Sequence, residues 1–305
     1  MNTQTIEKQV LSSDGVHTLK GIIYLPTGTP QGIFHLVHGM TEYIGRYDSL
    51  LALIASAGFI ACGFDNLGHG KTASEAELGF IAEKDGYKYL IDDVLVFGNA
   101  VKADFPDLPY YLMGHSMGSF IVRLTAEKYK NDIDRLIICG TGGPNPAAGI
   151  GLALIDILTL FKGRHAYSSF IENIAFGSYN KRFEGGGKYE WLTKDEGIKK
   201  AYAADPLCTF RFTLSALKDL IKLNSLCNRN AWFKNMRKNM PIMLISGEDD
   251  PVGNYGKGVT AVYKKLKANG CDVTIHLYEN CRHEIHNDTC KEQSAQDILK
   301  FIMKA

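Results

Sequence analysis

The segment YYLMGHSMGSF, residues 110–120, holds one serine between two glycines, where a strand-like pattern changes into a helical one. Residues 109–116 form an apolar run typical of a buried strand, and residues 117–130 have helical spacing. The Gly-x-Ser-x-Gly pattern is weak by itself, because a shuffled chain with the same 31 glycines and 14 serines in 305 residues carries about 0.14 matches. Whether Ser116 is a nucleophile therefore depends on its surroundings.

A sharp turn from strand to helix suits a nucleophilic serine. Glycine at positions 114 and 118 removes Cβ atoms that would collide with the backbone, so the serine can project above the sheet. The amide of Met117 then lies at a helix N-terminus, where backbone donors and the helix dipole favour a developing negative charge. A serine in a surface turn needs no such arrangement.

Strands and helices alternate on both sides of this segment. Strand-like segments lie at residues 17–26, 31–39, 59–65, 109–116, 134–142, 241–250 and 271–279. Helical patterns lie at residues 45–58, 87–106, 117–130 and 256–270, and a last helix closes the chain. This alternation predicts an α/β fold, with a mostly parallel sheet and helices on both faces.

The alternation is interrupted between residues 144 and 238, where the pattern is mainly helical and no strand candidate matches the others. This stretch predicts a helical cap inserted into a core made of residues 1–143 and 239–305. The expected place for the cap is above the carboxyl ends of the strands, where open α/β sheets bind their ligands.

A nucleophilic serine needs a base and a group that orients the base. Asp249 and Asp250 follow one predicted strand, and His283 and His286 follow the next, so all four reach the same sheet edge as Ser116. The aspartates could instead cap a helix. The histidine pair is one residue short of the H-E-x-x-H zinc motif, so no metal is expected.

A second donor for an oxyanion is expected after an earlier strand. In HLVHGMTE, residues 35–42, His38 and Gly39 end a buried run, and the Met40 amide would point back over the sheet. A plain glycine turn is the alternative for this segment. All four features fall at the carboxyl ends of predicted strands, and this joint placement favours a catalytic site.

Bulk properties exclude several classes of protein. The formal net charge is +1 and the basic residues are dispersed, so no nucleic-acid partner is expected. No signal peptide or membrane span is evident. The seven cysteines are odd in number and scattered, which predicts reduced thiols in a cytoplasmic protein, Cys281 and Cys290 included.

The motifs together resemble those of the α/β-hydrolase fold, in particular its monoacylglycerol lipase and lysophospholipase-like group. HGMTEYIGRY (residues 38–47) is similar to that group's His-Gly-x-x-Glu-x-x-x-Arg-Tyr stretch, and DNLGHGKT (65–72) to its Asp-x-x-Gly-His-Gly-x-Ser, with Thr72 in place of serine. GHSMGS, GEDDPV and RHEIHND are similar to its nucleophile, acid and histidine segments. The motifs extend from about residue 17 to the end of the chain, and the cap contributes none.

The resemblance implies Ser116 as nucleophile, His283 as general base and then acid, and Asp250 as the residue that orients His283. Met40 and Met117 would supply the oxyanion amides, and no cofactor is implied. The implied reaction is hydrolysis of a small-molecule carboxylic ester, lipophilic like a monoacylglycerol or a lysophospholipid, through an acyl-enzyme.

The substrate is less constrained than the chemistry. A short-chain or aromatic carboxylesterase, or a thioesterase, keeps the same three residues, whereas a non-catalytic binding module would be expected to have lost one of them. The apolar run at residues 147–161 could line an acyl groove, pack within the cap or make transient contact with a membrane surface. The sequence does not indicate an oligomeric state.

Overall fold

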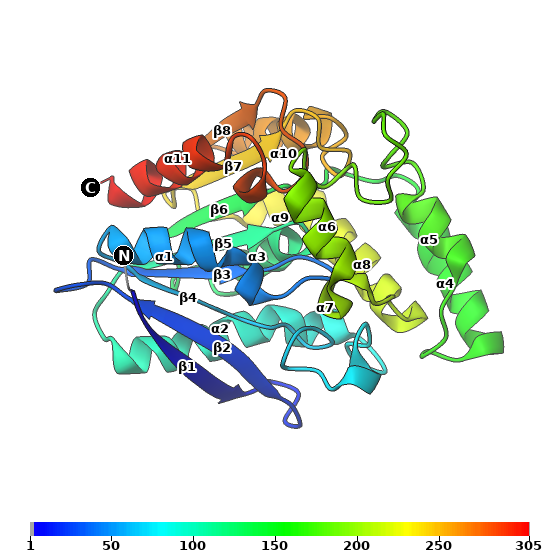
Figure 1. Cartoon of the computed structure of the whole chain (residues 1–305), viewed down its shortest axis with the longest axis horizontal. Helices are drawn as coiled ribbons and strands as arrows, with labels where there is room; N and C mark the ends of the chain where they lie inside the picture. The colour runs from blue at the N-terminus through cyan, green and yellow to red at the C-terminus, as the bar shows by residue number, and fades with distance from the viewer. Residues whose placement is uncertain (1–2, 305) are drawn as a thin grey trace.

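The computed structural model describes residues 3–304 and contains one eight-stranded sheet with helices on both faces (Figure 1). The strands are β1 (Gln4–Leu11), β2 (Thr18–Leu25), β3 (Ile33–Val37), β4 (Ile60–Phe64), β5 (Tyr110–His115), β6 (Arg135–Cys139), β7 (Ile242–Gly247) and β8 (Val273–Tyr278). Their order across the sheet is β1-β2-β4-β3-β5-β6-β7-β8. The pairs β1–β2 and β2–β4 are antiparallel, and all others are parallel.

Two hydrophobic cores lie on the two faces of the sheet. The core helices are α1 (Asp48–Ser56), α2 (Gly86–Asp104), α3 (Met117–Lys128), α10 (Lys257–Ala268) and α11 (Lys291–Met303). Helices α2, α3 and α10 share one core, and α1 and α11 share the other. Along β5, Tyr110 and Leu112 belong to the first core, while Tyr111 and Met113 belong to the second, because strand side chains alternate between faces. The predicted α/β architecture is confirmed.

Strand β1 has no counterpart among the strands predicted from sequence. It pairs only with β2 at the sheet edge, and most of its residues are exposed. An exposed edge strand needs few apolar residues, so QTIEKQVL lacks the apolar run that marks the buried strands.

The stretch from residue 144 to residue 238 is mainly helical, with turns and irregular structure at residues 177–195. It contains α4 (Ala148–Lys162), α5 (Ser169–Phe176), α6 (Glu196–Ala204), α7 (Pro206–Thr209), α8 (Leu214–Cys227) and α9 (Asn230–Asn235). Helices α4 and α5 lie at the edge of the molecule (Figure 1). Helix α8 packs on α2 and α3, and Trp232 of α9 donates to the Arg123 carbonyl oxygen at 2.7 Å. The stretch therefore combines an outer part with helices packed on the core.

Candidate active site

Ser116 lies in the turn between β5 and α3, with φ 54° and ψ −119°. A positive φ is uncommon for a residue with a side chain, and such backbone strain often accompanies a functional site. The turn has no room for larger neighbours: a Cβ at Gly114 would lie 2.2 Å from the Gly118 oxygen, and one at Gly118 would lie 2.1 Å from the Val37 oxygen. The two glycines therefore allow the turn that presents Ser116.

Two backbone amides lie beside Ser116. Met117 is the first residue of α3, so its amide is one of the donors that a helix leaves unpaired at its N-terminus. Gly39 packs against the serine, because a Cβ added to Gly39 would lie 3.0 Å from the Ser116 Cβ, and Met40 follows it. Met40, Ser116 and Met117 all line one pocket. The two residues predicted to supply oxyanion amides therefore lie beside Ser116 at one pocket.

Asp250 and His283 meet at the end of the sheet. The His283 Nδ1 atom lies 2.9 Å from Asp250 Oδ2, and both side chains are buried. Asp250 also accepts from Ser246 Oγ at 3.2 Å and from the Val252 amide at 2.8 Å, which fixes the carboxylate. Within residues 3–304, the buried His283 Nε2 has no hydrogen-bond partner. That nitrogen is therefore available to a serine proton, and His283 lines the same pocket as Ser116.

The neighbouring acid and histidine occupy different environments. Asp249 is 43% exposed at its side chain, and its Oδ2 atom lies 3.7 Å from Lys194 Nζ. His286 stacks on Tyr47, with ring centroids 4.4 Å apart. Burial, together with the nearby His115, lowers the pKa of His286 to about 3. The geometry thus brings Asp250 and His283 together, and it leaves Asp249 and His286 outside that pair.

A buried ionic network lies behind the serine and was not assigned a role from sequence. Glu42 Oε1 accepts from the Gly39 amide at 2.5 Å and from Tyr47 Oη at 2.8 Å, while Arg46 Nη1 contacts Glu42 Oε2 at 3.0 Å. Arg46 also forms a bidentate pair with Glu284. The motif HGMTEYIGRY contains Glu42, Arg46 and Tyr47 of this network, but a motif cannot show which residue faces Arg46.

His115, the residue before the serine, joins this network. Its Nδ1 atom lies 3.3 Å from Glu42 Oε1 and 2.8 Å from Tyr47 Oη. Burial disfavours the charged imidazole, but the hydrogen bond and charge of Glu42 outweigh burial and raise the pKa of His115. The turn that carries Ser116 is therefore attached to the Glu42 loop.

The second sequence motif supports the same loop. Asp65 accepts from the Ile44 amide at 2.8 Å and from the Lys71 amide at 2.7 Å, so it closes its own loop and fixes the start of the segment that contains Arg46. Thr72, which replaces the usual serine, accepts from the Lys20 amide at 2.9 Å. A hydroxyl is all that this contact requires.

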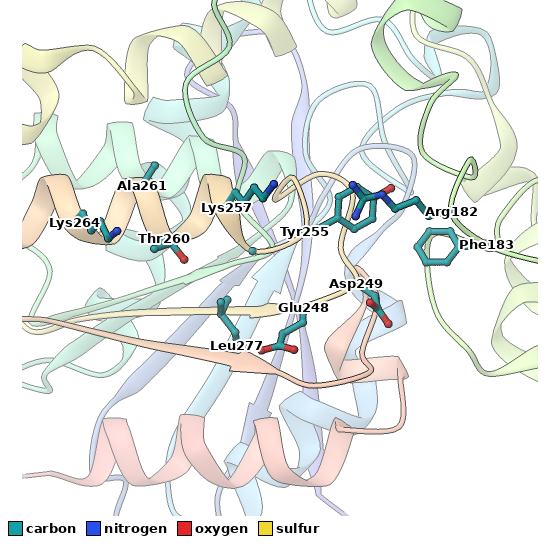
Figure 2. A pocket seen from close by; sticks show the side chains of 11 residues that line it. Arg182, Phe183, Glu248, Asp249, Tyr255, Lys257, Thr260, Ala261, Lys264 and Leu277 are labelled. Carbon is teal, nitrogen blue, oxygen red and sulfur yellow. The ribbon is translucent and has the colours of Figure 1, made fainter.

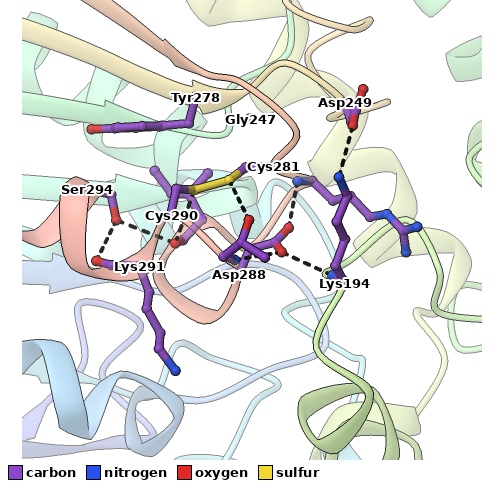
Figure 3. Close-up of a disulfide and its surroundings, with 12 residues drawn as sticks. Lys194, Gly247, Asp249, Tyr278, Cys281, Asp288, Cys290, Lys291 and Ser294 are labelled. Atoms are coloured by element: carbon purple, nitrogen blue, oxygen red, sulfur yellow. Dashed lines mark hydrogen bonds and ion pairs between the residues drawn. A yellow bond between two sulfur atoms is a disulfide. The ribbon is translucent and has the colours of Figure 1, made fainter.

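The expectation of reduced thiols is wrong for one pair of cysteines. Cys281 and Cys290 form a disulfide whose Cα atoms lie 6.4 Å apart, at the two ends of the loop that contains His283 (Figure 3). The two cysteines are nine residues apart in the sequence, and this spacing does not indicate that they meet. They meet because the loop folds back on itself through a short 3-10 helix, Ile285–Asn287. The other five cysteines are free and buried.

The segment between α5 and α6 is attached to the same loop. The His283 amide donates to the Trp191 carbonyl at 3.3 Å, and the Glu284 amide donates to the Leu192 carbonyl at 2.7 Å. Next to them, Lys194 contacts both Asp249 and Asp288 near the disulfide (Figure 3). The position of His283 thus depends on this segment as well as on the sheet.

The pocket above Ser116 has a volume of about 910 Å³. Apolar side chains from α3, α4, α5 and α8 form much of its wall, among them Phe120, Ile150, Leu154, Ile171, Phe176, Leu217, Leu220 and Ile221. Its acidic residues are each paired: Glu42 and Glu284 with Arg46, and Glu172 with Arg211. Such a wall suits an apolar chain better than a cation.

A second hollow of about 800 Å³ lies on the other side of the acid loop. Figure 2 shows Arg182, Tyr255 and Asp249 around it, with the Arg182 guanidinium 3.7 Å from the Tyr255 ring centroid. It is open, and Ser116, Asp250 and His283 are not part of its lining.

Glu42, His115 and His286 form a group whose ligand atoms lie within 4.8 Å of one another, which is close enough to hold a metal ion. The carboxylate of Glu42 is already used by Gly39, Tyr47 and Arg46. A cation there would also face the Arg46 charge, so the donor set does not fit a metal ion. Within residues 3–304, no helix has the length and apolar character needed to cross a membrane.

Comparisons with known proteins agree with this geometry. A family model described as serine aminopeptidase, S33 matches residues 28–290. Human monoglyceride lipase is 24% identical over 266 residues, which cover 86% of this chain and 78% of the human protein. A thermostable carboxyl esterase from Bacillus coagulans, solved in complex with glycerol, superposes with a TM-score of 0.92 at 30% identity, over 99% of this chain and 98% of that one. A structure titled "Lipase (Open form)" has a TM-score of 0.91 at 26% identity and covers 98% of each chain. The predicted α/β-hydrolase fold and family resemblance are confirmed.

Proposed function

The chain belongs to the serine aminopeptidase S33 family, and on that premise we propose that it hydrolyses lipophilic carboxylic esters. The observation that carries the proposal is the buried Asp250–His283 pair, whose His283 lines the same largely apolar pocket of about 910 Å³ as the strained Ser116. The human lipase and the Bacillus coagulans esterase support the prediction of a carboxylic ester hydrolase.

In the proposed reaction, Ser116 Oγ attacks the ester carbonyl while His283 Nε2 accepts its proton. The amides of Met40 and Met117 stabilise the oxyanion. His283 then protonates the leaving alcohol, and the Ser116 acyl ester remains. His283 then deprotonates a water molecule, which attacks the acyl ester, and the imidazolium returns that proton to Ser116 Oγ as the acid leaves. Asp250 keeps the imidazole in the tautomer that both steps need.

The pocket favours an ester over a peptide with a free N-terminus. An α-ammonium group needs an unpaired carboxylate, and each acidic residue of the pocket is paired with an arginine. An acyl chain needs only the apolar wall between α3, α4, α5 and α8. The substrate is therefore an ester with a medium or long acyl chain, such as a monoacylglycerol.

The cap provides a surface for transient contact with lipid. Leu160 and Phe161 at the end of α4 are each 84% exposed, and Phe170 and Ile174 of α5 are 60% and 58% exposed. These residues lie on the two helices that also form one wall of the pocket. Exposed apolar residues grouped in this way mark interaction surfaces, and the substrate itself is a lipid.

The test is hydrolysis of p-nitrophenyl esters from acetate to palmitate, of a monoacylglycerol, of a lysophospholipid and of leucine p-nitroanilide. Parent protein and Ser116→Ala are compared. We expect activity that rises with chain length, that is absent from the variant, and that does not extend to the anilide. A preference for acetate would refute the lipophilic substrate, and cleavage of the anilide alone would favour a peptidase.

The lipid contact is measured separately with phosphatidylcholine vesicles. The double variant Leu160→Ser with Phe161→Ser is expected to bind vesicles more weakly while it hydrolyses p-nitrophenyl butyrate like the parent. Equal vesicle binding by parent and variant would refute the contact.

A further inference from the structure

Two loops that lie far apart in sequence supply groups to the proposed reaction. The loop after β3 contains the Met40 amide, and the loop after β8 contains His283. Arg46, which follows the first loop, forms a bidentate pair with Glu284 of the second, 238 positions away, at distances of 2.6 and 2.7 Å. The two side chains are only 10% and 2% exposed.

Each end of this pair is attached to a reacting group. On one side, Arg46 contacts Glu42, whose Oε1 atom holds the Gly39 amide at 2.5 Å, next to Met40. On the other side, Glu284 is the residue after His283, so its backbone is continuous with that of the base. A rigid guanidinium thus connects the oxyanion loop to the histidine loop.

The network places three charged side chains in the interior of the protein. Burial acts to raise the pKa values of the Glu42 and Glu284 carboxyl groups, but His115 beside Glu42 and Arg46 beside Glu284 lower them below their ordinary values. The two carboxylates therefore stay charged. A buried ionic group of this kind is often no more stabilising than apolar residues of the same volume. What it does provide is a fixed geometry, because the planar guanidinium donates two parallel hydrogen bonds to a carboxylate in one orientation.

We propose that Glu284 is a positioning residue, which fixes the His283 imidazole relative to Ser116 and the Met40 amide through its fork with Arg46. This inference rests on the proposed ester hydrolysis by Ser116. The ring of His283 is held by Asp250, but Asp250 itself belongs to the acid loop. Loss of the fork removes a direct side-chain connection between the histidine loop and the oxyanion loop, and a displacement of about 1 Å can reduce a rate about 100-fold.

The test uses Glu284→Gln, Arg46→Lys and the double variant. Each substitution keeps the approximate volume and removes the bidentate pair: glutamine removes the carboxylate charge, and lysine keeps the positive charge but lacks the planar guanidinium. Glu127→Gln is the matched control, because Arg229 Nη2 contacts both Glu127 oxygens, at 3.1 and 2.9 Å, between α3 and α9 and outside the pocket. Melting temperatures identify variants that are folded at the assay temperature. The readouts are kcat and KM on p-nitrophenyl butyrate and the rate at which a fluorophosphonate labels Ser116.

For Glu284→Gln we expect kcat to fall about 10- to 100-fold and KM to change less than about threefold, with labelling slowed by the same factor as kcat. The double variant should be no more than about threefold slower than the slower single variant, because both substitutions remove one interaction. Glu127→Gln should match the parent. A role in stability alone would lower the melting temperature and leave kcat unchanged.

A folded Glu284→Gln variant with kcat within twofold of the parent would overturn the proposal, as would losses that multiply in the double variant. If Glu284→Gln does not fold, Arg46→Lys gives the same comparison. A parent that is labelled by the fluorophosphonate but hydrolyses no ester refutes the proposed substrate, and the labelling rates still test Glu284. A parent that is inert to both refutes the role of Ser116, and this inference with it.

Discussion

The substitution Asp250→Asn tests the proposed orientation of His283 most directly. In the structure, Asp250 Oδ2 lies 2.9 Å from His283 Nδ1, and Oδ1 accepts from the Val252 amide at 2.8 Å. An asparagine that keeps its oxygen on the Val252 amide turns its NH₂ group toward Nδ1. The imidazole must then accept at Nδ1 and carry its proton on Nε2, where it cannot take the Ser116 proton.

The expected loss follows from that tautomer. Removal of a correctly oriented base in a triad of this type reduces kcat by about 10⁴-fold, which corresponds to about 5.5 kcal/mol of activation free energy. Because asparagine has the shape of aspartate, we expect folding to be retained. The assay is the initial rate of p-nitrophenyl butyrate hydrolysis near neutral pH, with circular dichroism to confirm the fold.

The preceding residue provides the control. The Asp249 side chain is half-buried, and its ion pair with Lys194 at 3.7 Å lies near the surface, where such pairs are worth about 0.2–1 kcal/mol. We expect Asp249→Asn to keep kcat within about threefold of the parent. The assignment of Asp250 is refuted if Asp250→Asn keeps more than a tenth of the parent kcat. It is also refuted if the kcat of Asp249→Asn falls by the same factor as that of Asp250→Asn.

Three further results are expected. The Cys281–Cys290 bridge closes a loop of about ten residues, so the double variant Cys281→Ala with Cys290→Ala should have a free energy of unfolding about 2.7 kcal/mol lower than the parent in urea titration. The denatured, unreduced parent should show five reactive thiols, and seven would contradict the bridge. Leu154→Trp should shorten the pocket by about two methylene groups and lower kcat/KM for dodecanoate relative to butyrate by about 15-fold, whereas an unchanged ratio would place the acyl chain elsewhere. The pKa values of Glu42 and Glu284 are lowered in the folded protein, so these carboxylates contribute stability that is present above their ordinary pKa of about 4.5 and is lost as the pH falls through the lower folded values. In urea titrations at acid pH, the free energy of unfolding should therefore fall less with decreasing pH in Glu284→Gln than in the parent. Equal decreases would contradict the lowered pKa of Glu284.

The sequence could predict most of the core because buried parallel strands and amphipathic helices have strong patterns. Residues 109–116 and 117–130 became β5 and α3, and the turn between them contains Ser116, as GHSMG indicated. Strand β1 could not be recognised, since an exposed edge strand leaves no apolar run. The mainly helical character of the stretch after residue 144 could be predicted from its sequence pattern. The pattern could not predict which of these helices pack on the core.

The sequence by itself determined which residue types reach the carboxyl edge of the sheet: a serine, two aspartates, two histidines and the amides of two strand-ending turns. It did so because residues just past the ends of parallel strands share one edge whatever the rest of the chain does. Only the tertiary structure decided that Nδ1 of His283 faces Asp250, that Cys281 reaches Cys290, and that Arg46 pairs with Glu284. Those contacts join positions up to 238 residues apart, and their geometry depends on how the loops pack, which no local pattern records.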